Sequence, residues 1–436
     1  MAVLSAGRQA FRQLNAPTER PDARWEQLIM RIGFIGTGIL MLNMAFRSWQ
    51  VGQVGSRHVV VGLVFAEYAV AFALLVIGVA SISRMRRLVP LIAVATLFAF
   101  VVWSFIQIHI AYTLYGTDNA ALSHVAAEKL IDGQNPYSFN DRTLVVDSAA
   151  RFGVPQTFIT DTTDGQPLSS LMSWPAGSVL VLVPTIAAGI HDVRWVVVAF
   201  EIAAFALIWC RAPAALRPLS LLPLTVDPDL FIQFTGGGVM DYLWVAPMVA
   251  CAIALYSRRF TVAGLLYGLA CGIKQQPWLL APFLVIFVWQ TTDQDRRAAA
   301  LAELIGAGTV GFLALNLPFM VWNLHDWIRG VMLPLSQPLV PFGSGISLLT
   351  QAGIADLPKR FYSAATFGVW AVLIITYALH FRTLKHGLWF APAIIMWFGY
   401  RGLQNYFVFW APIALVALFV RWEEQELVGG GEEVQA

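Results

Sequence analysis

Long apolar segments recur along most of the chain and constrain its fold more than any other feature. A segment of about 20 apolar residues is long enough to cross the hydrocarbon of a bilayer as a helix. The continuous candidates are residues 30–47, 58–82, 89–113, 195–210, 217–234, 239–256, 299–322 and 361–381. Only 12% of the residues are charged, against about 25% in soluble domains. We therefore predict an all-α polytopic membrane protein.

Two further apolar segments are interrupted by polar residues and flanked by basic residues at both ends. Residues 261–290 break near Lys274 and Pro277, and residues 386–421 break near Arg401. Basic loops remain in the cytoplasm, so a single crossing would place one basic end on the wrong side. We therefore predict two shorter helices in each segment, with Lys274 and Arg401 at the outer turn.

The longest polar stretch, residues 114–173, follows the third apolar segment and is predicted to be extracytoplasmic. Residues 171–190 are then critical, because a full crossing there would move the basic loop 211–217 outside. We predict instead that this segment enters the membrane and returns, covered by protein because its backbone cannot face lipid. The expected total is about 12 crossings, with both termini inside.

Three regions follow from this topology. Residues 1–29 are polar and arginine-rich, and we expect a cytoplasmic amphipathic helix or a disordered segment without a cleavable signal peptide. Residues 30–421 are expected to form one transmembrane domain. Residues 422–436 form an acidic tail, which we expect in the cytoplasm because acidic residues weigh little in the orientation rule.

The same topology brings five ionisable residues to the outer face: Asp118, Asp241, Lys274, His325 and Arg401. Such residues at membrane depth cost at least a few kcal/mol, so they usually line a cavity or a pathway. Two cations on one face suit a phosphate or diphosphate anion. No zinc-type spacing, phosphate-binding glycine loop or dense carboxylate cluster accompanies them, so we predict no metal and no cofactor.

Simpler interpretations of these residues remain open. Asp118 is also a good N-cap for a helix over residues 118–131. Lys274 and Arg401 have side chains long enough to reach lipid headgroups without binding a substrate. His325 is typical of an interfacial histidine whose ring nitrogens have protein partners.

Several short motifs together resemble a known family. They are Asp118, the alanine-rich stretch after it, Gly133-Gln-Asn-Pro-Tyr137, Trp174-Pro175-Ala176 and Gly268-Leu-Ala-Cys-Gly-Ile-Lys274-Gln-Gln-Pro277. In this order they resemble the motifs of GT-C glycosyltransferases, in particular the polyprenyl-phosphate-mannose-dependent mannosyltransferases of glycosyltransferase family 87. The similarity covers roughly residues 90–420.

The resemblance implies a GT-C-like fold and an inverting transfer of a sugar, mannose first, from a polyprenyl-phosphate donor. The acceptor would be a lipid or glycan on the extracytoplasmic face, and membrane lipids, not nucleic acid, would be the other partners. Asp118 would be the general base. The expected donor-phosphate ligands are Lys274, Arg401 and His325, and the expected sugar and acceptor pocket contains Asn135, Tyr137, Trp174, Asp241 and Gln404.

Two other classes of protein remain open. A transporter or flippase of lipid-linked saccharides also uses buried charges and broken helices, although we find no convincing inverted repeat in the sequence. A non-catalytic membrane subunit that supports a cell-envelope complex would need no pocket joining loop 114–173 to Lys274 and Arg401.

Overall fold

The computed structural model describes residues 21–52, 57–82, 84–111, 114–137, 141–160, 162–225, 232–337 and 339–432. Nearly all regular structure in these ranges is helical, and the one sheet described there has two short parallel strands. The chain forms two compact units. Unit 1 contains Met1–Thr113 and Ile208–Ile232, and unit 2 contains Leu114–Leu207 and Gln233–Ala436.

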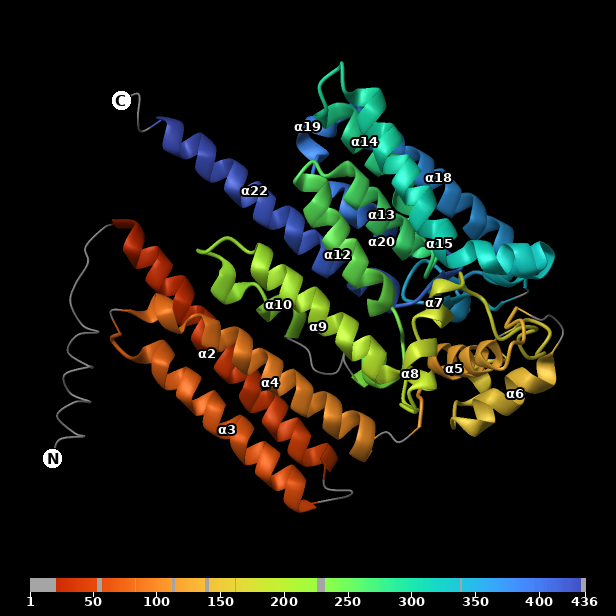
Figure 1. Ribbon diagram of the computed structural model, residues 1–436, viewed down its shortest axis with the longest axis horizontal. Helices are drawn as coiled ribbons and strands as arrows, with labels where there is room; N and C mark the ends of the chain where they lie inside the picture. Colours follow the sequence, from red (N-terminus) through yellow and green to blue (C-terminus); the bar gives the residue numbers. More distant parts are fainter. Residues whose placement is uncertain are drawn as a thin grey trace. The chain divides into compact units, whose positions relative to one another are not determined.

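Unit 1 is built on three long helices that lie side by side (Figure 1). Its elements are α2 (Pro21–Gly52), α3 (Arg57–Val79), η1 (Met85–Leu88), α4 (Pro90–Ile106), η2 (Gln107–Ala111), η4 (Arg217–Leu219) and α10 (Leu222–Thr225). The valines Val60 and Val64 of α3 pack with Val102 and Ile106 of α4 in a buried apolar cluster. These positions repeat at helical spacing, so one apolar face of each helix is covered by the other.

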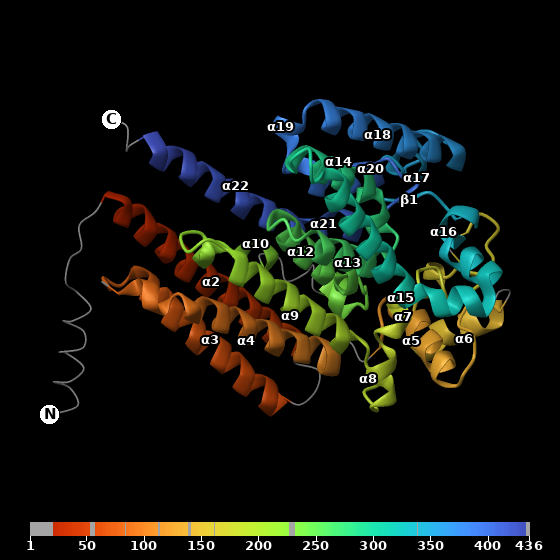
Figure 2. The ribbon, with the colours of Figure 1, turned by 45° about the horizontal axis from the view of Figure 1, so that its top comes forward.

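Unit 2 begins with the polar region that follows Leu114 and continues through a series of long and interrupted helices (Figure 2). Its first elements are α5 (Asp118–Ile131), α6 (Arg142–Arg151), η3 (Gln156–Phe158), α7 (Gly177–Leu180) and α8 (Val183–Ala187), followed by α9 (Arg194–Arg211), whose residues from Ile208 onward belong to unit 1. Next come η5 (Ile232–Gly236), α12 (Tyr242–Tyr256), α13 (Phe260–Cys271), η6 (Gln276–Leu280), α14 (Ala281–Thr291), α15 (Arg297–Val331) and α16 (Leu333–Ser336). The last are β1 (Phe342–Gly343), α17 (Leu348–Gln351), α18 (Lys359–Leu379), α19 (Phe381–Leu384), η7 (Gly387–Phe390), α20 (Ala391–Trp397), β2 (Arg401–Gly402), α21 (Asn405–Val408) and α22 (Ala411–Glu432).

Within the part of the chain that the structure describes, six helical segments are long and apolar enough to cross a membrane: Arg24–Val51, His58–Val79, Met85–Ala111, Arg297–Val331, Lys359–Leu379 and Asn405–Glu426. Shorter apolar helices cover Gly177–Ala187, Tyr242–Tyr256, Phe260–Cys271 and Gly387–Trp397. The prediction of a mainly helical chain with several membrane-type helices is therefore confirmed.

Both interrupted segments fold as predicted, with a helix on each side of a polar break. Helix α13 ends at Cys271 and η6 begins at Gln276, while α20 ends at Trp397 and α21 begins at Asn405. Residues 171–190 contain only the short helices α7 and α8, too short for a full crossing at about 1.5 Å per residue.

The described parts of the predicted continuous helix at 217–234 do not form one continuous helix. These parts, 217–225 and 232–234, form the short elements η4, α10 and the start of η5. Pro218 and Pro223 explain the difference, because proline removes a backbone donor and clashes with the preceding turn.

The chain ends also differ in their boundaries. Helix α2 begins at Pro21, so residues 21–29 continue directly into the first apolar helix, and residues 1–20 lie outside the described ranges. Helix α22 extends to Glu432 through most of the acidic tail. Within it, Glu424 forms an ion pair with Lys385 at 2.5 Å, and its Oε2 lies 3.1 Å from Nε2 of His386.

Helices α13 and α15 pack unusually closely, because glycine occupies their contact line. A Cβ on Gly268 would lie 1.9 Å from the carbonyl oxygen of Gly308, and one on Gly264 would lie 2.2 Å from the oxygen of Leu304. Small residues at four-residue spacing allow this approach between apolar helices. The packing matters for function because α13 leads directly into the break that contains Lys274.

We predict that Gly268→Ala destabilises the protein by about 1–3 kcal/mol, the usual cost of overpacking a tight contact. A matched change on the facing helix provides the control, because a Cβ on Gly306 meets no atom within 4 Å. Gly306→Ala should be neutral or stabilising by up to about 1 kcal/mol through helix propensity. Thermal unfolding of the purified proteins in detergent measures both, and equal midpoints would contradict the close contact.

Candidate functional site

Asp241 is the centre of a buried polar network at the start of α12. Its Oδ1 lies 2.6 Å from Lys274 Nζ and accepts a 2.6 Å hydrogen bond from Trp244 Nε1. Its Oδ2 accepts a 2.6 Å hydrogen bond from Asn405 Nδ2. A carboxylate removed from water is costly unless it is paired and hydrogen-bonded, and here both oxygens have partners.

Lys274 is held in place by the break between α13 and η6. Its backbone N–H donates to Ala270 O at 3.1 Å, a bond of the α-helical type, so the last turn of α13 sets the position of Lys274. The neighbouring Gln275 donates from Nε2 to Ser173 O and Val331 O, both at 2.8 Å. Lys274 Nζ lies 5.9 Å from the centre of the Trp174 ring, within range of a cation–π interaction.

Asp118 occupies the first position of α5, directly after the N-cap Thr117. Two hydrogen bonds bring this helix start against the turn before α12: Gly116 N donates to Gly237 O at 2.9 Å, and Met240 N donates to the side-chain oxygen Oδ1 of Asn119 at 3.3 Å. Gly238 adopts a φ of +91°, and a Cβ there would lie 2.7 Å from the Ala120 side chain. The turn therefore needs glycine at position 238.

The electrostatic surroundings of Asp118 show which charges lie near it. Desolvation by burial raises the pKa of the Asp118 carboxyl above its ordinary value. The positive charges of Arg401 and Lys274 act in the opposite direction, so both lie near enough to affect this carboxyl. Asp118 as a whole residue is half-buried.

Arg401 comes from the second interrupted segment. Its backbone forms β2, which pairs in parallel with β1, so that Phe342 aligns with Arg401 and Gly343 with Gly402. The side chain is half-buried. We refer to Asp118, Asp241, Lys274 and Arg401 as the charged cluster; it contains two carboxylates and two cations from separate parts of unit 2.

Of the residues predicted to form the sugar and acceptor pocket, Trp174 lies beside the charged cluster, whereas Tyr137 and Asn135 form structural contacts within the polar region. Trp174 is partly exposed and lies beside Lys274, next to the charged cluster. Tyr137 is fully buried, and its hydroxyl donates to Trp174 O at 2.7 Å, so it fixes the polar region to the segment before α7. Asn135 Oδ1 accepts from Tyr137 N at 3.0 Å, a local turn that shapes this anchor.

His325 and Gln404 have no described contact with the charged cluster. His325 follows a kink in α15 at Asn323, and its side chain is 73% exposed, with Nδ1 3.3 Å from Asp326 Oδ1. Gln404 is exposed at the N-cap of α21. Its neighbour Asn405 is the residue that reaches Asp241, because the turn directs the Asn405 side chain inward.

Two members of the network were missed by sequence reasoning. Asn405 is a lone amide at the point where an apolar segment resumes, and Trp244 stands three residues after Asp241 on the same helix. Residues three apart on a helix are neighbours, so Trp244 could have been found from its spacing to Asp241. Asn405 could not, because its role depends on which side of the turn faces inward.

Metal ligands are not concentrated here. Across the ranges that the structure describes, no three residues of the His, Cys, Asp or Glu types are grouped so that they could hold a metal ion.

Comparison with known proteins gives no matching family model, no similar curated protein and no similar solved structure. The class of protein therefore rests on the fold and the site alone. They define a mainly helical protein with membrane-type helices, in which two interrupted segments and the start of α5 bring charged side chains together.

We predict that Lys274→Met destabilises the fold by about 3–5 kcal/mol, because it leaves Asp241 buried without a cation. Asp241→Asn should be destabilising for the converse reason. The double variant should lose much less than the sum of the two single losses, since no unpaired charge remains. Unfolding of all four proteins in detergent provides this cycle. Additivity within about 0.5 kcal/mol would show that the two side chains are not coupled.

Proposed function

We propose that this protein is a membrane glycosyltransferase with a GT-C-like fold of about 12 crossings. It transfers a sugar, mannose first, from a polyprenyl-phosphate donor to a lipid or glycan acceptor on the extracytoplasmic face. The observation that carries the proposal is the surroundings of Asp118, a half-buried residue whose carboxyl has a pKa raised by burial and lies near the positive charges of Arg401 and Lys274. A base and two cations are the groups that such a transfer requires.

Asp118 is proposed as the general base. In its ionised form it takes the proton of the acceptor hydroxyl while that oxygen forms a bond to the anomeric carbon of the sugar. The bond from this carbon to the lipid phosphate breaks on the opposite side, so the configuration inverts. A raised pKa favours this role, because a stronger base removes the hydroxyl proton more effectively near neutral pH.

Arg401 and Lys274 are proposed to bind the donor phosphate and to stabilise its charge as it leaves. The planar guanidinium of Arg401 suits two phosphate oxygens at once. The ammonium of Lys274 is fixed by Asp241, so this carboxylate is a positioning residue in the proposal. Trp174 offers a partly exposed aromatic surface beside Lys274 for the sugar.

The other predicted contacts have less support from the structure. Tyr137 and Asn135 would act through the loop they anchor, since the Tyr137 side chain is fully buried. His325 and Gln404 are exposed and would need the bound donor or acceptor to reach them.

A transporter or flippase of lipid-linked saccharides is the second candidate, and one observation favours it. The breaks at Lys274 and Arg401 interrupt apolar segments, an arrangement that transporters use to place charges at membrane depth. Purified protein in detergent separates the two functions, because sugar transfer needs no sealed compartment whereas transport does.

We predict that Asp118→Asn lowers the rate of sugar transfer by about 10²–10⁴-fold, the usual contribution of a general base. The amide keeps the shape and removes the basicity. The assay uses purified protein in detergent and a radiolabelled polyprenyl-phosphate-mannose donor. Asp132→Asn, the same change at the exposed C-cap of α5, is the matched control and should retain normal activity. Near-normal transfer by Asp118→Asn would remove Asp118 from the role of base.

The raised pKa of Asp118 also predicts the pH profile of the reaction. A base acts only when ionised, so kcat/KM should fall as the pH drops through the raised pKa of this carboxyl. The acid limb should therefore lie above about 3.9, the ordinary value for aspartate. Rates measured across the pH range with fixed ionic strength test this. A limb at or below the ordinary value, or the same limb in Asp118→Asn, would contradict the assignment.

A further inference from the structure

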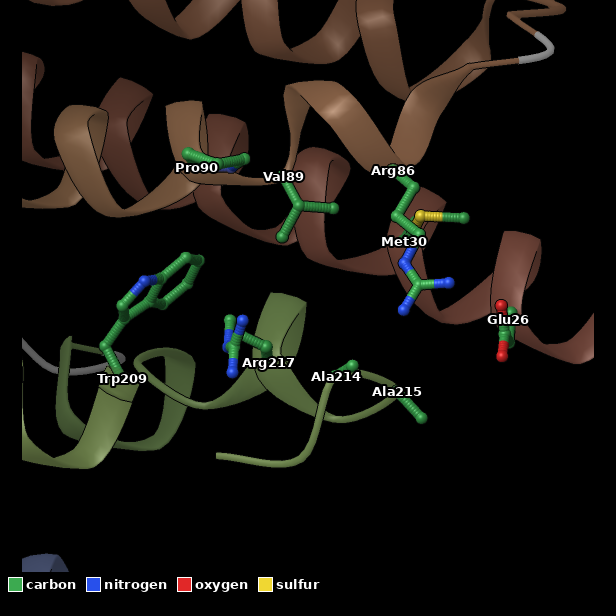
Figure 3. A pocket seen from close by; sticks show the side chains of 9 residues that line it. All are labelled: Glu26, Met30, Arg86, Val89, Pro90, Trp209, Ala214, Ala215 and Arg217. Atoms are coloured by element: carbon green, nitrogen blue, oxygen red, sulfur yellow. The ribbon is translucent and has the colours of Figure 1, made fainter. Parts of the chain in front are cut away.

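Unit 1 contains a polar hollow that the proposed transferase reaction does not use. It lies among the N-terminal turns of α2, η1 and the start of α4, the end of α9, and the segment that leads into the first residue of η4 (Figure 3). The lining residues are Glu26, Met30, Arg86, Val89, Pro90, Trp209, Ala214, Ala215 and Arg217. All of them belong to unit 1, so the hollow is complete within one compact body.

Two arginines give this hollow a positive character. The guanidinium groups of Arg86 and Arg217 are both directed toward its interior (Figure 3). Among the described residues, neither forms an ion pair with a carboxylate within the usual 4.0 Å. Arg217 donates from Nη2 to Ala212 O at 3.1 Å, while its Nε is buried without a described partner. An unsatisfied buried donor on a cation indicates a site with capacity for an anion.

The position of Arg217 is fixed by close packing. A Cβ on Gly33 of α2 would lie 2.7 Å from both the side chain and the carbonyl oxygen of Pro218. The backbone of η4 therefore lies directly on α2, and Arg217 precedes this contact by one residue. The arginine is thus presented by a rigid support.

The hollow lies where three helices begin or end. Two membrane-type segments start here, Arg24–Val51 and Met85–Ala111, and α9 finishes at Arg211. Positive residues gather at such ends on the cytoplasmic side, where anionic lipids create a negative surface potential. Trp209 adds an indole, the side chain typical of the membrane interface.

We propose that this hollow binds the phosphate of an anionic phospholipid headgroup from the cytoplasmic leaflet. Arg86 and Arg217 donate to the phosphate oxygens, and the planar guanidinium groups suit that geometry. Met30, Val89 and Pro90 provide apolar contacts for the start of the lipid chains. Glu26, on the rim, accepts a hydrogen bond from a headgroup hydroxyl, so phosphatidylglycerol is the preferred chemical class.

The experiment uses the full-length protein in a neutral detergent. Dioctanoyl-phosphatidylglycerol, dioctanoyl-phosphatidylcholine and inorganic phosphate are titrated separately, and thermal stabilisation reports binding. We expect saturable stabilisation by the phosphatidylglycerol alone. Arg86→Gln and Arg217→Gln should each weaken its apparent affinity about fivefold, the effect expected from one basic residue at an anionic surface. Arg86 is exposed, so its variant tests the site without disturbing the interior.

Arg87→Gln provides the matched control, because Arg87 is exposed in the same short η1 helix but does not line the hollow. It should bind like the unaltered protein. Three results would overturn the proposal: equal stabilisation of the unaltered protein by phosphatidylcholine, unchanged affinity in Arg86→Gln, or equal loss in Arg87→Gln. Equivalent saturable binding of inorganic phosphate would assign the site to a soluble anion and would exclude the lipid.

Discussion

The buried ion pair between Asp241 and Lys274 is the interaction on which the candidate site depends. Each charge makes the burial of the other possible, since a single unpaired ion in this environment would cost several kcal/mol. The pair also joins distant parts of the chain, because it links the start of α12 to the break after α13, and Asn405 adds the second interrupted segment. Without it, the ammonium of Lys274 would have no fixed direction.

Close approach of backbones explains how these parts meet. Gly116 contacts Gly237, Gly177 N donates to Gly272 O at 2.9 Å, and Gly268 lies against Gly308. The contacts at Gly177 and Gly268 exclude a side chain, and the one at Gly116 is tight, so close backbone approach rather than large side chains connects these parts of unit 2. These contacts place the start of α5 near the break that contains Lys274. The charged cluster is therefore a product of backbone packing as much as of charge.

Much of this arrangement follows from local patterns. The break at Lys274 was predictable because basic ends flank an apolar segment with Pro277 near its centre. The helix at Asp118–Ile131 has its predicted bounds, but Asp118 is its first helical residue and Thr117, not Asp118, is the N-cap. The break at 217–234 was not predicted, although Pro218 and Pro223 marked it, because hydropathy alone favoured a continuous helix. Gln404 was selected in place of Asn405, because sequence does not show which of two adjacent amides turns inward.

The sequence by itself determined that the chain is rich in apolar helices and that a few charged residues interrupt them, since the periodicity and length of such segments reflect burial in a nonaqueous medium. Only the tertiary structure decided which charges pair. Lys274 Nζ lies 2.6 Å from Asp241 Oδ1, whereas His325 contacts only its neighbour Asp326 among the carboxylates described. Tyr137 is fully buried and connects two segments of the chain. Pairing across long chain separations depends on how helices pack and where turns bend, and neither is encoded in the spacing of residues along one segment.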